Sequence, residues 1–181
     1  QTLSTSGATL TYKATGNVIV DPNSTLQTNA GTITLWSDTD GTTSRGGGVK
    51  TGSGSSILST GGAISISGGT DNTTSWAKGT TTTSDVGVYL SGSINSGSGS
   101  ITIRGEEGAS PASNAQGVLI DKGLEIKSTT GDITINGKVD ATSTNTTNGH
   151  TAVYIGNNDA ANLAKLTTTS GAINITADAS G

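Results

Sequence analysis

The stretch GDITINGKV, residues 131–139, contains a short phrase that the chain repeats. In this phrase a glycine is followed by any residue, an aliphatic residue, any residue and a second aliphatic residue. It occurs as GTITL at 31–35, GAISI at 62–66, GSITI at 99–103, GDITI at 131–135 and GAINI at 171–175. Alternation of apolar and polar residues indicates a β-strand with one buried face. The glycines are 31, 37, 32 and 40 residues apart, so each copy marks one repeat unit of similar size.

Two further apolar positions belong to each unit. An aliphatic residue stands seven positions before the first aliphatic residue of each phrase, in the pairs Leu3/Leu10, Leu26/Ile33, Ile57/Ile64, Ile94/Ile101, Ile126/Ile133 and Leu166/Ile173. The first pair adds a sixth copy. A third strand is predicted eight residues earlier still, at Val18, Val49, Val86 and Val118. Val153 lies thirteen residues before Leu166, with NNDAA at 157–161 as an insertion.

The register of the third copy has two solutions. Val88 could take the place of Val86, because a slip of two residues keeps the same face of a strand buried. With Val86, the valine follows the first aliphatic residue of the phrase by 8, 16, 22, 17 and 20 residues in successive copies. The spacings of seven and eight residues stay constant, apart from the insertion before Leu166. All larger length variation is therefore expected at one corner of the repeat unit.

Two constant spacings and one variable one predict an all-β fold, a parallel β-helix with three strands per coil and five to six coils. The rule for parallel crossovers favours the right-handed form. A β-sandwich also has short alternating strands, but it would not keep these spacings. The expected buried ladders are Leu10, Ile33, Ile64, Ile101, Ile133, Ile173 and Tyr12, Leu35, Ile66, Ile103, Ile135, Ile175. The glycines at 31, 62, 99, 131 and 171 are expected at a corner that needs positive φ or close backbone approach.

The composition restricts the class of protein. Charged residues make up only 12% of the chain, the net charge is −4 and there is no cysteine. A disulfide framework and thiolate metal sites are therefore excluded, and the acidic balance argues against a nucleic-acid partner. No apolar run approaches the ~18 residues that span a bilayer, so we expect no membrane insertion. Low aliphatic content is also typical of disorder, but here the apolar residues are periodic.

The repeats resemble a known family. LEIKSTTGDITINGKV at 124–139 and AKLTTTSGAINITADASG at 164–181 are similar to the filamentous-haemagglutinin type of β-helix repeat, found in two-partner-secretion exoproteins and other giant bacterial adhesins. The resemblance implies a right-handed shaft, exported through an outer-membrane transporter to the cell surface or medium. It also implies a role in adhesion or matrix building, with host-cell or matrix glycans, proteins or sister molecules as partners. Residues 1–181 are expected to be one segment of a longer rod; the secretion domain of the family is not recognisable.

Two alternatives to a non-enzymatic shaft remain open. Parallel β-helices also include polysaccharide lyases and glycoside hydrolases, which need acids clustered on one face. The only adjacent acids are Glu106 and Glu107, beside Arg104, and we expect them in a solvated turn. His150 is expected at the surface before the Val153 strand. We therefore predict no catalytic residues and no cofactor. The other alternative is a subunit that stacks end to end into an extracellular filament.

Metal and modification sites have weak signals. SDTDGTT at 37–43 is half of a calcium loop, with Asp38 and Asp40 alternating before Gly41, but it lacks the later bidentate acid. We expect a turn there, no metal, and another turn at RGGG, 45–48. Asn-x-Ser/Thr sequons occur at Asn23, Asn72, Asn145 and Asn174, and chance explains them in a chain so rich in threonine.

A contact surface is the remaining candidate site. Trp36 is expected to point outward and Trp76 to lie within an insert, and in the Val88 register Tyr89, Leu119 and Tyr154 form an outward row. Exposed apolar rows mark interaction sites, unless an insert covers them. The inserts 36–48, 67–85, 104–116 and 136–150 should all leave the rod on one side. Variable loops often carry recognition, so that side is a second candidate surface.

Overall fold

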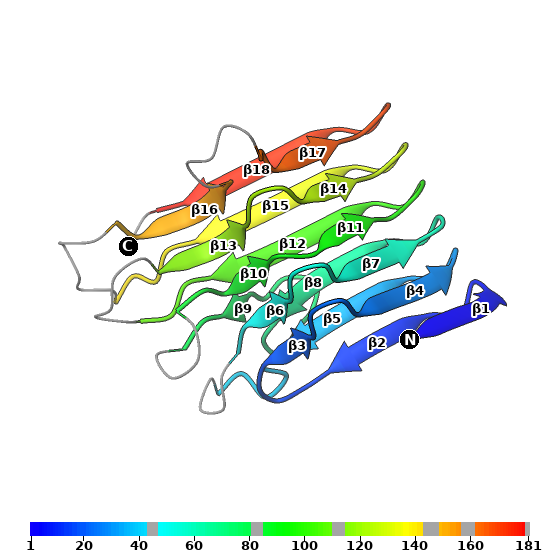
Figure 1. Cartoon of the computed structure of the whole chain (residues 1–181). Coiled ribbons are helices and arrows are strands. Elements are labelled where there is room, and N and C mark those ends of the chain that lie inside the picture. The colour runs from blue at the N-terminus through cyan, green and yellow to red at the C-terminus, as the bar shows by residue number, and fades with distance from the viewer. Residues whose placement is uncertain (43–46, 81–84, 110–114, 143–148, 157–161, 180–181) are drawn as a thin grey trace.

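The chain winds into a parallel β-helix of about six coils, seen side-on in Figure 1. The structure is a computed structural model that describes residues 1–42, 47–80, 85–109, 115–142, 149–156 and 162–179. Each of the first five coils contributes one strand to each of three sheets, and the last described coil contributes to two of them, which confirms the predicted three strands per coil. None of the described residues belongs to a helix long and apolar enough to cross a membrane.

Sheet A contains the strands that precede the repeated phrase. Leu26 and Ile94 both pair with Ile57, as the spacing of seven residues predicts. The strands, in the order of the stack, are β1 (Thr2–Ser6), β4 (Thr25–Asn29), β7 (Ser56–Ser59), β11 (Ser93–Asn95), β14 (Glu125–Lys127) and β17 (Lys165–Thr167).

Sheet B contains the repeated phrase itself. Ile101 pairs with Ile64 on one side and with Ile133 on the other, so the predicted ladder forms. The strands are β2 (Leu10–Lys13), β5 (Ile33–Ser37), β8 (Ile64–Gly68), β12 (Ile101–Glu106), β15 (Ile133–Lys138) and β18 (Ile173–Asp178). A short extra strand from an insert, β9 (Ala77–Lys78), pairs with the end of β12 and was not predicted.

Sheet C contains the valine strands and decides the ambiguous register. Val88 pairs with both Val49 and Val118, so the Val88 alternative is right and the Val86 alignment is wrong. The strands are β3 (Val18–Val20), β6 (Val49–Thr51), β10 (Val88–Leu90), β13 (Gln116–Ile120) and β16 (Thr151–Ile155). Val153 pairs with Val118 as predicted. The predicted insertion at 157–161 lies outside the described residues.

The Val88 register also shows that the corner between sheets C and A does not have the constant length that the sequence predicted. In the third coil this corner is two residues shorter than in its neighbours, and it turns at Ser91 and Gly92. The backbone N–H groups of both residues donate to Thr51 Oγ1 of the coil below, at 3.0 and 3.1 Å. A Cβ at Gly92 would come within 2.7 Å of the Ser55 carbonyl oxygen. Glycine therefore permits the tighter turn.

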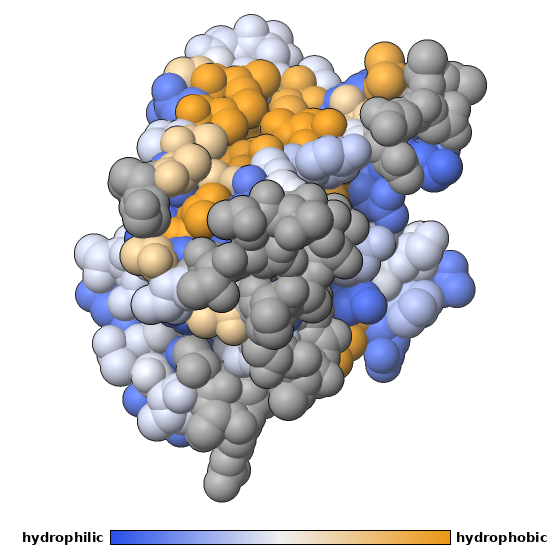
Figure 2. Space-filling model, turned by 90° about the vertical axis from the view of Figure 1, so that its left-hand side faces the viewer, coloured by the Kyte–Doolittle hydropathy of each residue, from blue (hydrophilic) through white to orange (hydrophobic). Residues whose placement is uncertain are grey.

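The interior is lined by the predicted ladders, and its central members are inaccessible to solvent. Ile33, Leu35, Ile66, Ile101, Ile103, Ile133 and Ile135 are all 0% exposed. The burial prediction fails at both ends of the stack, where Tyr12 is 38%, Ile173 42% and Ile175 46% exposed. These residues are in register, but a described coil covers them on one side only. Figure 2 shows apolar side chains gathered at the top of the stack, where Figure 1 places the last coil.

The glycine row at the start of sheet B is explained by close approach. A Cβ at Gly99 would collide with the carbonyl oxygen of Gly62, and a Cβ at Gly131 with that of Gly99. None of the glycines in this row adopts positive φ, so of the two predicted reasons close backbone approach is the one that holds. A buried hydroxyl completes the corner: Ser59 Oγ accepts from the N–H of Gly62 at 2.7 Å and donates to the Gly31 carbonyl oxygen at 3.1 Å.

Candidate contact surface and insert edge

An outward row of side chains crosses sheet C, and we call it the sheet C row. It is formed by register pairs between neighbouring strands and consists of Ile19, Lys50, Tyr89, Leu119 and Tyr154. The structure thus brings together the three residues predicted from the Val88 register. Ile19 and Lys50 extend the row to five coils and were missed. They directly follow Val18 and Val49, so the same alignment could have identified them.

The sheet C row is accessible at both ends. Ile19 is 62% and Tyr154 37% exposed, Lys50 is exposed, and Tyr89 and Leu119 are half-buried. Tyr89 is held in place by its neighbours. Its hydroxyl donates to Asp121 Oδ2 at 3.1 Å, and Lys50 Nζ lies 5.3 Å from the centroid of its ring. The ring is therefore fixed against the sheet by a hydrogen bond and a cation–π contact.

The two tryptophans lie outside this row. Trp36 points outward from sheet B, as predicted, but its ring is already engaged. Its Nε1–H donates to the Gly69 carbonyl oxygen at 2.6 Å, and Lys13 Nζ lies 4.1 Å from the ring centroid. Trp76 is half-buried in the segment just before β9. The Trp36 side chain hydrogen-bonds an insert to sheet B, so the structure does not join the tryptophans into one surface with Tyr89.

The described parts of the inserts follow sheet B and lie at one edge of the stack, on the left in Figure 1. The Gly69 N–H donates to the Ser37 carbonyl oxygen and the Glu107 N–H to that of Lys138, each at 3.0 Å. The prediction that the inserts leave on one side is confirmed for these parts. Residues 43–46, 81–84, 110–114 and 143–148 lie outside the description, with Arg45 and Asn145 among them.

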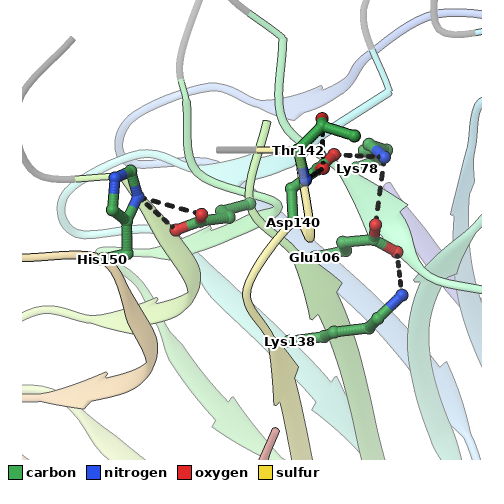
Figure 3. Close-up of polar contacts among 7 residues, drawn as sticks. Lys78, Glu106, Lys138, Asp140, Thr142 and His150 are labelled. Carbon is green, nitrogen blue, oxygen red and sulfur yellow. Dashed lines mark hydrogen bonds and ion pairs between the residues drawn. The ribbon is translucent and has the colours of Figure 1, made fainter. Parts of the chain in front are cut away.

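A charged network joins three of these inserts (Figure 3). Lys78 Nζ lies 3.0 Å from Glu106 Oε1 and 2.6 Å from Asp140 Oδ2, and Lys138 Nζ lies 3.5 Å from Glu106 Oε2. Lys78, Glu106 and Lys138 come from the neighbouring strands β9, β12 and β15, so opposite charges alternate across the ladder. Residues far apart in the sequence are thereby linked across successive coils.

Burial and hydrogen bonding act in opposite directions on the titration of this network. Burial alone would raise the pKa of Asp140, but hydrogen bonds from Lys78 and Thr142 outweigh it and bring the pKa to about 2. Burial lowers the pKa of Lys78, and the hydrogen bonds to Asp140 and Glu106 again outweigh it, so the net change is upward. Both groups therefore stay charged at neutral pH and hold each other in place.

Glu107 departs from its predicted environment. Its side chain is 0% exposed, and His150 Nδ1 lies 2.9 Å from Oε1 and 3.1 Å from Oε2. The predicted solvated turn is therefore wrong for Glu107. The predicted surface position is also wrong for His150, whose side chain is 14% exposed. A buried carboxylate needs a charged or hydrogen-bonding partner, and the imidazole supplies one. Glu106 contacts the two lysines instead, so the adjacent glutamates do not converge on one point.

The half calcium loop is a turn, as predicted. Asp38 has a φ of 49°, and its carbonyl oxygen accepts from the Gly41 N–H at 2.8 Å. Asp40 Oδ1 accepts from the backbone N–H and the hydroxyl of Thr42, at 3.3 and 3.1 Å. The same Asp-x-Thr turn recurs at Asp71 and Asp140, a repeat that sequence reasoning missed. Within the described part of the chain, no three His, Asp or Glu side chains gather to hold a metal ion.

Compared with protein-family models, with curated proteins and with solved structures, the chain gives no significant match.

Proposed function

We propose that this chain is a structural and adhesive shaft of a secreted bacterial surface protein, acting in adhesion or in building an extracellular matrix. The observation that carries the proposal is the sheet C row, an outward line over five coils in which four side chains are apolar or aromatic and the fifth is Lys50. Apolar side chains kept in line on an exposed face favour contact with a partner. The likeness of the repeats to filamentous-haemagglutinin shafts supports the same reading.

The chemistry of the insert edge favours a shaft over a polysaccharide-acting enzyme. A glycosidase uses two carboxyl groups that face one bond, one of them free to give a proton. Glu106 and Asp140 are both bound to Lys78, and Glu107 is buried against His150. Each of these carboxylates already has a cationic or imidazole partner that stabilises the fold. We therefore assign this cluster to the linkage of inserts.

Attachment of beads coated with the purified chain to cells or to extracellular matrix tests the proposal. The double variant Tyr89→Ser/Leu119→Ser should lose most of the attachment because it removes the centre of the sheet C row. The matched control is Leu58→Ser, which removes a half-buried side chain from sheet A. Melting temperatures of all variants show that the fold is kept. If the double variant attaches as well as the parent chain, the row is not the contact surface.

A further inference from the structure

The shape of the sheet C row limits what it can bind. Its side chains stand in single file, one from each of five neighbouring strands. Parallel strands lie about 4.8 Å apart, so Ile19 and Tyr154 are separated by roughly 19 Å. A stable protein interface buries about 800 Å² on each partner, which a line one side chain wide does not provide. A long and narrow surface of this kind fits a linear polymer.

A hollow opens at the first half of the row. Its volume is about 130 Å³, and Ile19, Val49 and Tyr89 are among the residues that form its walls. Asn17 and Lys50 add polar groups to the same hollow. Apolar walls with a few polar groups are typical of small-ligand sites, and a volume below the roughly 300 Å³ of ordinary ligand pockets leaves room for part of a ligand, such as a single ring. A sugar ring has an apolar C–H face for the walls and hydroxyl groups for the polar residues.

Charge adds a preference for anionic sugars. Lys50 is exposed, and among the described residues no carboxylate forms an ion pair with it. Asp121, which borders the row, is already occupied: its Oδ2 accepts from the hydroxyls of Tyr89 and Ser91, at 3.1 and 3.2 Å. The ammonium group of Lys50 therefore offers its positive charge to a ligand at the rim of the hollow. A carboxylate on the ligand forms a stronger hydrogen bond with this ammonium group than a neutral hydroxyl does.

We propose that the sheet C row binds a linear glycan in which the sugar held in the hollow carries a carboxylate group. One ring sits in the hollow against Ile19 and Tyr89, with its carboxylate on Lys50, and the following sugars run along the row over Leu119 to Tyr154. Tyrosine suits such a chain because its ring is apolar and its hydroxyl is polar. This inference rests on the proposed adhesive function and names the chemistry of its partner. Uronic-acid and sialic-acid polymers share that chemistry.

Calorimetric titration of the purified chain with oligomers of defined length tests the proposal. The probes are oligogalacturonates, oligosialic acids and methyl-esterified oligogalacturonates, which keep the same rings without the charge, all in EDTA to exclude metal bridging. Affinity for at least one carboxylated series should rise with length until the oligomer spans the row. The methyl esters should bind about tenfold more weakly, as expected for the loss of one charge-assisted contact. The series that binds identifies the source of the carboxylate.

Variants separate the roles of the row residues. Lys50→Gln should lower the affinity about tenfold, and Lys50→Arg should keep most of it. Lys165→Gln, which removes an exposed lysine from sheet A, is the matched control and should bind like the parent chain. Equal binding of esters and acids, an equal loss in Lys165→Gln, or no binding of any oligomer would overturn the proposal. If no oligomer binds while the Tyr89/Leu119 variant still loses attachment, the glycan inference fails and the adhesive function stands.

Discussion

The interior ladders and the insert edge join the coils by different means. In the interior, the same kind of side chain stacks on itself, as in Ile64, Ile101 and Ile133, and each coil repeats the contact. At the edge, unlike residues from different inserts form single links, such as Lys78 with Asp140 and Glu107 with His150. Repeat proteins are stabilised mainly by contacts between nearest neighbours. Among the described residues, the edge adds connections between particular coils, such as the pair of Glu107 with His150.

The largest expected effect is in the interior. Ile133→Asp places a carboxylate in a ladder position that is 0% exposed, between Ile101 and Ile173, and should lower the free energy of unfolding by at least 4 to 5 kcal/mol, as a rough estimate for an unpaired buried charge. Thr134→Asp is the matched control, because the next residue of the strand points outward. Urea unfolding measures both. Equal losses in the two variants would contradict the alternation on which the coil is built.

A smaller effect is expected at the edge. His150→Ala removes the imidazole that lies 2.9 Å from the fully buried Glu107 carboxylate and should cost about 2 kcal/mol. Adding Glu107→Gln should recover part of the loss, because the buried group is then neutral. A double-mutant cycle from urea unfolding gives the coupling of the pair. Simple additivity of the two substitutions would show that the pair does not hold the insert.

The smallest expected effect is a loss of stability at acid pH. The pKa of Asp140 falls from 3.8 to about 2 in the folded chain, so its carboxylate stabilises the fold above pH 3.8. That contribution should be lost as the pH drops from 3.8 through 2. Asp140→Asn should therefore show a smaller fall of the urea midpoint across this range than the parent chain. The control is Asp21→Asn, on an exposed residue after β3, and its urea midpoint should fall as much as that of the parent chain. If the midpoint of Asp140→Asn also falls by that amount, the ionised Asp140 carboxylate does not stabilise the fold.

The contrast also explains what the sequence could predict. The ladders repeat, so the spacing of Ile101 and Ile133 was enough to place them in register. The alternation of apolar and polar residues could not decide between Val86 and Val88, because residues two positions apart point to the same face of a strand. Glu107 and His150 are 43 residues apart in inserts that do not repeat, and no periodic signal connects them. Lys50 was overlooked because a charged residue does not mark an apolar row, although its position after Val49 was available.

The direction of the hydrogen bonds has a mechanical consequence. In this fold the bonds between coils run along the axis of the stack, so a pull along the axis loads them directly and can open the shaft one coil at a time. Successive repeats are 23 to 40 residues apart. At 3.3 to 3.6 Å for each extended residue, one opened coil would release about 75 to 140 Å of chain, against a height of about 4.8 Å in the stack. Under tension along its axis, the β-helix would therefore open stepwise and absorb mechanical work with each coil.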